Sequence, residues 1–216
     1  MADRQFNLTV LISGNGSNLQ ALIDACASGT LPNARITHVI SNRKAAYGLT
    51  RAANASIPTS YHNLVPYKKK HPEDTDRART EYDADLAKLI LDLQPRPDLI
   101  VCAGWMHIVT SSFLSPIASA GTKIINLHPA LPGEFAGAGA IERAWEAGRK
   151  EGLKRTGVMI HEVIAEVDAG AAIVTAEVEL KEGESLDDLE TRIHSVEHGL
   201  IVEGTRRTLA GLGKKA

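Results

Sequence analysis

Two polar residues, Asn126 and His128, stand two positions apart where the apolar run at residues 123–125 meets a Gly/Pro-rich loop. Because alternate side chains of a β-strand point to the same face, these two would project together at a strand end. An amide donor beside an imidazole suits a reaction that builds negative charge on a carbonyl oxygen while a proton moves. The alternative is a strand end whose polar residues cap the following loop.

A second candidate site is the segment Ser-Gly-Asn-Gly-Ser-Asn at residues 13–18, between an expected first strand and an expected first helix. Backbone N–H groups at such a junction form an anion site, and glycines let the backbone approach a ligand closely. The segment lacks the Gly-Lys-Ser/Thr of a Walker loop. It also lacks the third glycine and the acidic residue of a dinucleotide fingerprint. A single terminal phosphate, as on a ribose phosphate, fits better; a tight turn with an Asn/Ser cap is the alternative.

Apolar runs alternate with amphipathic segments along the chain, which is typical of an α/β fold with a Rossmann-like, mostly parallel sheet flanked by helices. Helices are expected near residues 19–26, 78–93 and 185–209, and a solvated loop or helix start at 65–79. A tight turn at residues 168–170 separates the last two strands, so we expect an antiparallel pairing near the C-terminal end. The expected strands are residues 8–12, 35–41, 59–62, 99–103, 123–127, 155–161 and 173–178.

The composition favours one compact domain over residues 1–216, because 216 residues with 44% hydrophobic side chains suffice for a single α/β core. The formal net charge of -2 gives no general attraction to nucleic acid or to an anionic membrane. Cys26 and Cys102 are expected to be buried free thiols, a pattern of a reducing compartment. Residues 1–7 lack a basic segment followed by an apolar one, and no apolar stretch approaches a membrane span. We therefore expect a cytoplasmic protein. Separately, the tail at residues 211–216 is expected to be frayed.

The segment from His194 to His198 matches the zinc-binding pattern His-x-x-Glu-His. The apolar spacing, however, places Glu197 on the buried side of the last helix, with the histidines toward its edge. His161 is followed by a glutamate but lacks the second histidine of His-Glu-x-x-His. We therefore expect no metal; Glu197 either faces a polar substrate or is a plain buried carboxylate.

An ordered set of motifs resembles the phosphoribosylglycinamide formyltransferases, the glycinamide ribonucleotide transformylases of purine synthesis. The resemblance covers residues 8–209, and the set is more specific than any one motif. The matching segments are residues 10–20, 41–42, 47–49, 103–106, 126–129, 166–170 and 197–198.

The resemblance implies that the enzyme moves a formyl group from 10-formyltetrahydrofolate to the amine of 5'-phosphoribosylglycinamide. It implies a phosphate- and nucleotide-binding half at about residues 8–110. The other half, about 111–209, would complete the folate pocket and the catalytic site. The partners would be these two small molecules, with no nucleic acid, no membrane and no metal or redox cofactor, in a monomer or homodimer.

The resemblance also assigns roles to residues. Asn126 and His128 would stabilise the oxyanion of the tetrahedral intermediate. Asp168 would orient His128, raise its pKa and help to carry a proton. The substrate phosphate and ribonucleotide would be held by Gly14, Asn15, Gly16, Ser17, Asn18 and Glu197. The folate would be bound by Arg79, Met106, His107, Ile108, Val109, Glu166, Val167 and Asp168.

Two segments depart from the family pattern. His107 stands where relatives often have an arginine, which puts a folate contact through that guanidinium in doubt. Residues 130–137 read Ala-Leu-Pro-Gly-Glu-Phe-Ala-Gly where many relatives have Ser-Leu-Leu-Pro and then a basic residue. Neither departure touches the three residues expected to be catalytic.

Four alternative functions fit the sequence less well. A methionyl-tRNA formyltransferase would carry a C-terminal nucleic-acid-binding domain, and a formyltetrahydrofolate hydrolase an N-terminal regulatory domain; the sequence offers room for neither. A catalytically silent folate- or nucleotide-binding module would lack Asn126, His128 or Asp168. A nicotinamide-dependent oxidoreductase would need the glycine and acidic residue missing from the first loop.

Overall fold

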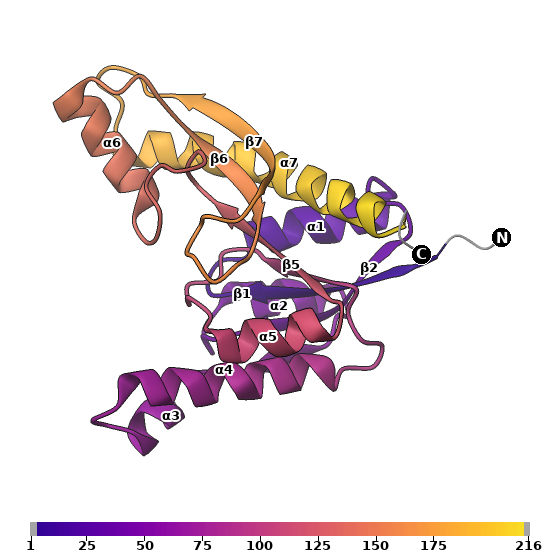
Figure 1. Cartoon of the computed structure of the whole chain (residues 1–216). Helices are drawn as coiled ribbons and strands as arrows, with labels where there is room; N and C mark the ends of the chain where they lie inside the picture. Colours follow the sequence, from indigo (N-terminus) through magenta and orange to yellow (C-terminus); the bar gives the residue numbers. More distant parts are fainter. Residues whose placement is uncertain (1–3, 214–216) are drawn as a thin grey trace. The chain divides into compact units, whose positions relative to one another are not determined.

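The computed structural model (Figure 1) describes residues 4–213 and divides into two compact units, of which the first ends at Ile124 and the second begins at Ile125. The first unit contains a parallel sheet in the strand order β3-β2-β1-β4. Its inner strands are buried on both faces, which explains their continuous apolar sequence. The strands are β1 (Phe6–Ile12), β2 (Ala34–Ser41), β3 (Thr59–Tyr61) and β4 (Leu99–Cys102).

Five helices flank or follow these strands in the described part of the first unit. Residues 65–79, expected as a loop or helix start, form α3 and the first turn of α4. The side chain of Asp74 starts α4 by accepting a hydrogen bond from the Arg77 N–H at 2.9 Å. The helices are α1 (Ser17–Ser28), α2 (Tyr47–Asn54), α3 (Val65–Lys70), α4 (Thr75–Leu91) and α5 (Ser111–Ser119).

The second unit is built on antiparallel strands in the order β5-β6-β7. The long helix α7 runs along β6 and β7 (Figure 1). A β-carbon on Gly204 would lie 2.6 Å from a methyl carbon of Ile160, so this glycine permits the close packing of α7 on β6. The elements are β5 (Lys123–His128), α6 (Ala140–Glu151), β6 (Arg155–Glu162), β7 (Ala172–Glu179) and α7 (Leu186–Gly213).

The expected fold class is confirmed: parallel strands come first, helices flank them, and antiparallel pairs follow toward the C-terminal end. All seven expected strands are present, with bounds shifted by one or two residues. The sequence reasoning missed α2, α5 and α6. Residues 211–213 of the expected frayed tail belong to α7, whereas residues 214–216 lie outside the described residues, as do residues 1–3.

The two cysteines differ in burial. Cys102 is a buried free thiol as expected, but Cys26 is only half-buried, because it lies toward the edge of the buried face of α1. Burial raises the pKa of the Cys102 thiol to about 12 and that of Cys26 to about 11.

None of the helices in residues 4–213 is both long and apolar enough to cross a membrane.

Candidate active site

The carboxylate of Asp168 lies at the centre of a polar cluster in the second unit. Its Oδ2 atom accepts a hydrogen bond from the Gly137 N–H at 2.8 Å and lies 3.4 Å from Nδ1 of His128. Its Oδ1 atom lies 3.4 Å from Nε2 of His161 and 3.5 Å from the amide nitrogen of Asn126. The side chains of Asn126 and His128 thus lie together beside the carboxylate of Asp168.

The strand pairing explains how these side chains meet. Asn126 and His128 alternate along β5, and the antiparallel register pairs Asn126 with His161 on β6. Asp168 lies in the connection between β6 and β7, where its backbone is left-handed with φ 54°. Aspartate is one of the few residues that tolerate this conformation, and here it lets the loop present the carboxylate to both histidines.

His161 is the member of this cluster that the sequence reasoning did not assign. Its Nδ1 atom donates to the backbone carbonyl of Glu162 at 2.9 Å, because a carbonyl can only accept. In the neutral ring Nε2 therefore accepts from the amide nitrogen of Asn126, at 3.1 Å. By accepting from this nitrogen, His161 fixes the orientation of the Asn126 side-chain amide. A signal existed in the sequence, since a β6 strand paired with β5 can place His161 opposite Asn126.

His128 has its proton on Nε2, which donates to the carbonyl of Phe135 at 3.1 Å. Burial lowers the pKa of this imidazole, and the charges of His161 and Arg143 add to that effect. Asp168 and the Phe135 carbonyl raise the pKa, but by less, so it lies below its ordinary value. Asp168 does raise the pKa of His128 as expected, but desolvation outweighs the neighbouring charge, so the net shift is downward.

Asp168 is held in its ionised form. Burial raises the pKa of the carboxyl, but its contact with His161, the hydrogen bond from the Gly137 N–H and the nearness of His128 bring it below the usual range. Near neutral pH the cluster therefore pairs an ionised carboxylate with a neutral imidazole. This combination is suited to accepting a proton and then releasing it.

The Gly-rich loop of the first unit leads directly into α1, as expected. Gly16 stands at the helix N-cap with φ 76° and no side-chain cap, so no N-cap side chain occupies the N–H groups of the first turn. A β-carbon on Gly16 would lie 2.6 Å from Cα of Gly48, so the loop packs directly on the backbone of α2. Arg51 of α2, which the sequence reasoning missed, donates from Nε to the Asn15 carbonyl at 3.0 Å and from Nη2 to the Asn15 side chain at 2.9 Å.

The segment from Met106 to Val109 is fixed by a buried carboxylate. His107 turns inward, with Nε2 2.7 Å from Oδ1 of the fully buried Asp83, whose Oδ2 accepts from the Thr110 N–H at 2.6 Å. The flanking side chains point outward, since Met106 is 70% exposed and Ile108 52% exposed. The His107 ring therefore holds this segment in place, whereas the side chains of Met106 and Ile108 are exposed to solvent.

Two further contacts tie this segment to its surroundings in the first unit. The Met106 N–H donates to Oγ of the buried Ser13, the first residue of the Gly-rich segment, at 2.7 Å. Arg79 donates from Nη2 to the carbonyl of Ile108 at 2.8 Å. The structure thus places Arg79 beside the expected folate-binding segment, where it supports the backbone.

The remaining expected site residues lie in the second unit. Glu166 and Val167 belong to the same β6–β7 connection as Asp168, and the Glu166 carbonyl accepts from the Ala169 N–H at 3.4 Å. Glu197 lies on the buried side of α7, as the apolar spacing predicted, whereas His194 is exposed and His198 is half-buried. Across residues 4–213, no group of three or more histidine, cysteine or acidic side chains has an arrangement that could hold a metal ion.

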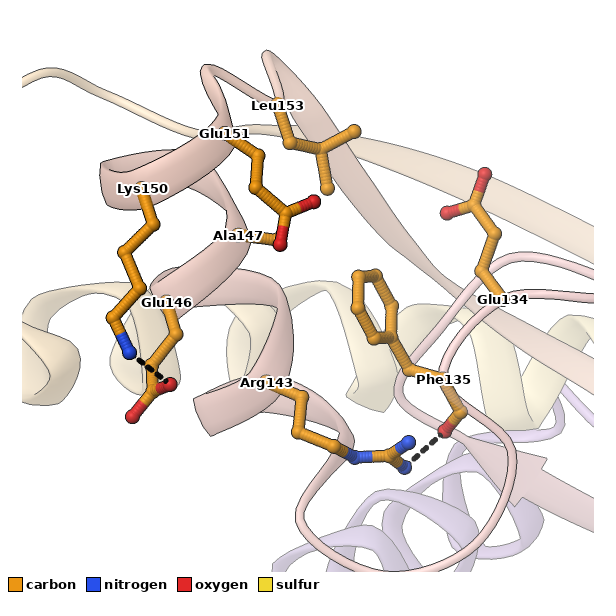
Figure 2. Close-up of a pocket in the computed structure, with 8 residues that line it drawn as sticks. All are labelled: Glu134, Phe135, Arg143, Glu146, Ala147, Lys150, Glu151 and Leu153. Atoms are coloured by element: carbon orange, nitrogen blue, oxygen red, sulfur yellow. Dashed lines mark hydrogen bonds and ion pairs between the residues drawn. The ribbon is translucent and has the colours of Figure 1, made fainter.

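A hollow of about 610 Å³ lies beside α6, between that helix and the Glu134–Phe135 loop (Figure 2). The ring of Phe135 points into it, and Lys150 pairs with Glu146 at 2.7 Å on its wall. None of the residues expected to bind substrate or folate lines it. The hollow therefore adds no ligand contact to the cluster around Asp168.

Comparison with known proteins settles the family. The formyl transferase model matches residues 6–205. The chain belongs to the formyl transferase family. It is 51% identical to the phosphoribosylglycinamide formyltransferase of Schizosaccharomyces pombe, over 94% of this chain and 97% of that protein. It is 48% identical to the Saccharomyces cerevisiae enzyme of the same name, over 96% and 99% of the two chains. The crystal structure of glycinamide ribonucleotide transformylase 1 from Symbiobacterium toebii is similar with a TM-score of 0.80, at 36% identity, over 94% of this chain and 86% of that one.

The lowered pKa of His128 predicts that this residue contributes to pH-dependent stability. The unfolded chain takes up a proton at this imidazole near its ordinary pKa of 6.5, whereas the folded chain resists protonation. The unfolded state therefore binds more protons below that pH, and stability decreases with falling pH. The contribution of His128 is fully present above pH 6.5 and is lost as the pH falls through its lower folded-state pKa.

Urea unfolding of the wild type and of His128→Gln from about pH 8 to about pH 5 measures this contribution. The wild type should lose more free energy of unfolding over this range than His128→Gln does. His194→Gln, which removes an exposed histidine of α7, should follow the wild type. Parallel curves for the wild type and His128→Gln would contradict the assignment.

Proposed function

We propose that this protein transfers the formyl group of 10-formyltetrahydrofolate to the amine of 5'-phosphoribosylglycinamide in purine biosynthesis, with Asn126, His128 and Asp168 as its catalytic residues. The observation that supports these roles is the cluster itself, in which an amide, an imidazole and an ionised carboxylate converge. The relatives named for this reaction match nearly their full length, which supports the same activity here.

The oxyanion would be stabilised by Asn126 and His128. Attack of the amine on the formyl carbon produces a tetrahedral intermediate whose oxygen carries negative charge, so donors placed there accelerate the reaction. His161 holds one N–H of the Asn126 amide at 3.1 Å. The other N–H lies on the Asp168 side of the cluster and can turn to the developing oxyanion.

The proton would move through His128. The neutral ring carries its proton on Nε2, so a second proton enters at Nδ1, which lies 3.4 Å from Asp168. The attacking amine loses this proton, and the leaving nitrogen of tetrahydrofolate receives it when the bond to the formyl carbon breaks. Because Asp168 stays ionised, it stabilises the imidazolium between these two transfers.

The substrates would bind to the other candidate residues. We assign the phosphate to the backbone and side chains of residues 14–18 and the remaining ribonucleotide to Glu197. We assign the folate to residues 106–109 and 166–168, with His107 acting through its backbone because its ring is engaged by Asp83. Arg79 would support the folate segment through the Ile108 carbonyl. The reaction needs no metal or nucleic acid, and we place it in the cytoplasm.

Loss of His128 or of the Asp168 charge should reduce turnover while the fold is retained. His128→Ala and Asp168→Asn are each expected to lower kcat by about 10²- to 10⁴-fold, since both act on charge formed only in the transition state. Formyl transfer to 5'-phosphoribosylglycinamide, followed by the formation of deformylated folate, measures this effect. The control is His38→Gln, which removes a partly buried histidine that pairs with Ser60 in the first unit. Turnover near that of the wild type in either variant would disprove its catalytic assignment.

The phosphate assignment predicts a selective effect on one substrate. Replacing both Ser17 and Asn18 with alanine should raise the KM for the ribonucleotide, because the loop loses hydroxyl and amide donors to the phosphate. The KM for formyl folate and kcat should change little. Steady-state kinetics with each substrate varied in turn separate the constants. A change confined to the KM of the folate would mean that the two binding sites have been assigned in reverse.

A further inference from the structure

Arg143, near the start of α6, is not among the residues so far assigned to the reaction. Its Nη2 atom lies within hydrogen-bond distance of three backbone carbonyl oxygens from one loop: 2.6 Å from Phe135, 2.7 Å from Ala136 and 3.0 Å from Ala138. Figure 2 shows the guanidinium reaching the Phe135 carbonyl while the Phe135 ring points into the hollow, with its centroid 5.8 Å from Cζ of Arg143. One nitrogen of the guanidinium therefore lies among three backbone carbonyl groups that converge on it.

The backbone of this loop needs such a cation. Phe135 is left-handed with φ 45°, which is unfavourable for a residue with a bulky side chain, and Gly137 is left-handed with φ 83°. The resulting path points three carbonyl dipoles at one place, where their partial negative charges repel each other. A guanidinium replaces that repulsion with charge-assisted hydrogen bonds.

Arg143 is poorly placed to stabilise its own helix. It is the fourth residue of α6, which begins at Ala140, and a cation near a helix N-terminus interacts unfavourably with the helix dipole. In that first turn the acidic Glu142, not Arg143, is the side chain that interacts favourably with the helix dipole. The contacts that favour an arginine here are those with the loop.

The same loop contacts both partners of the proposed proton transfer. The Phe135 carbonyl accepts from Nε2 of His128 at 3.1 Å, which fixes the proton on that nitrogen and leaves Nδ1 toward Asp168. Two residues later, the Gly137 N–H donates to Asp168 at 2.8 Å. The orientation of His128 and of Asp168 therefore depends on one short segment that Arg143 holds.

We propose that Arg143 is a positioning residue for formyl transfer, which holds the Phe135–Ala138 loop so that it presents an acceptor to His128 and a donor to Asp168. This inference rests on the proposed function only for its effect on turnover. The orientation of His128 can be tested without any substrate.

The kinetic test compares Arg143→Gln, Arg143→Lys and Arg149→Gln. Arg143→Gln should lower kcat on the order of 10- to 100-fold, with both KM values within about twofold of the wild type, because catalytic groups are misplaced while binding residues are intact. Arg143→Lys keeps a cation and should restore much of kcat. Arg149 lies on the same helix with its guanidinium over the Trp145 ring, 4.5 Å from the centroid, so Arg149→Gln is a matched control that should behave like the wild type.

A chemical rescue experiment uses a variant that lacks the whole side chain, Arg143→Ala. Millimolar guanidinium should partly restore the kcat of Arg143→Ala but not that of His128→Ala.

Nitrogen-15 NMR of the histidine rings provides the test that is independent of turnover. In the wild type near neutral pH, His128 should be protonated at Nε2 and unprotonated at Nδ1. Arg143→Gln should give a mixture of the two tautomers, and Arg149→Gln should not. An unchanged His128 tautomer together with an unchanged kcat in Arg143→Gln would overturn the inference. A wild type that transfers no formyl group would overturn the proposed function, and the NMR comparison would still decide the role of Arg143 in orienting His128.

Discussion

The carboxylate of Asp168, whose side chain is 11% exposed, is the constraint on which the rest of the candidate active site depends. A carboxylate removed from water is costly unless hydrogen bonds and opposite charges compensate it. Here the Gly137 N–H donates to the carboxylate, and two histidines on adjacent strands lie 3.4 Å away, where a protonated ring compensates the charge. Each of these partners must be held in place, which explains the left-handed backbone at Asp168, the shape of the loop before α6 and the pairing of β6 with β5.

The same burial shifts the pKa values of the two ionisable partners in opposite directions, and the proposed proton transfer depends on how each shift is offset. Burial lowers the pKa of His128, whereas the hydrogen bonds and charges around Asp168 keep that carboxyl ionised. A neutral imidazole beside a fixed negative charge can accept a proton without waiting for solvent to reorganise. The backbone carbonyl of Phe135 then decides which ring nitrogen is available. In the proposed mechanism, local structure thus prepares His128 and Asp168 for proton transfer before any substrate binds.

Some of this arrangement was predictable from the sequence and some was not. The alternation of Asn126 and His128 followed from strand periodicity, and a short connection rich in turn residues indicated the antiparallel β6–β7 pair. His161 depends on the register between β5 and β6, which periodicity does not determine. Arg143 acts through backbone carbonyls, which every sequence has, so its residue type carried no signal. His107 was recognisable as a departure, but only the structure shows that it is turned toward the buried Asp83.

Formyl transfer by the purified, chelator-treated protein is the most direct test of this account. The formation of deformylated folate would be followed with 5'-phosphoribosylglycinamide, without an acceptor, and with initiator methionyl-tRNA. Among the three conditions, the account predicts turnover only with 5'-phosphoribosylglycinamide as acceptor, the substrate for which the relatives that match over nearly their full length are named. Turnover without an acceptor would instead identify a hydrolase and contradict the central claim, as would the absence of turnover with every acceptor.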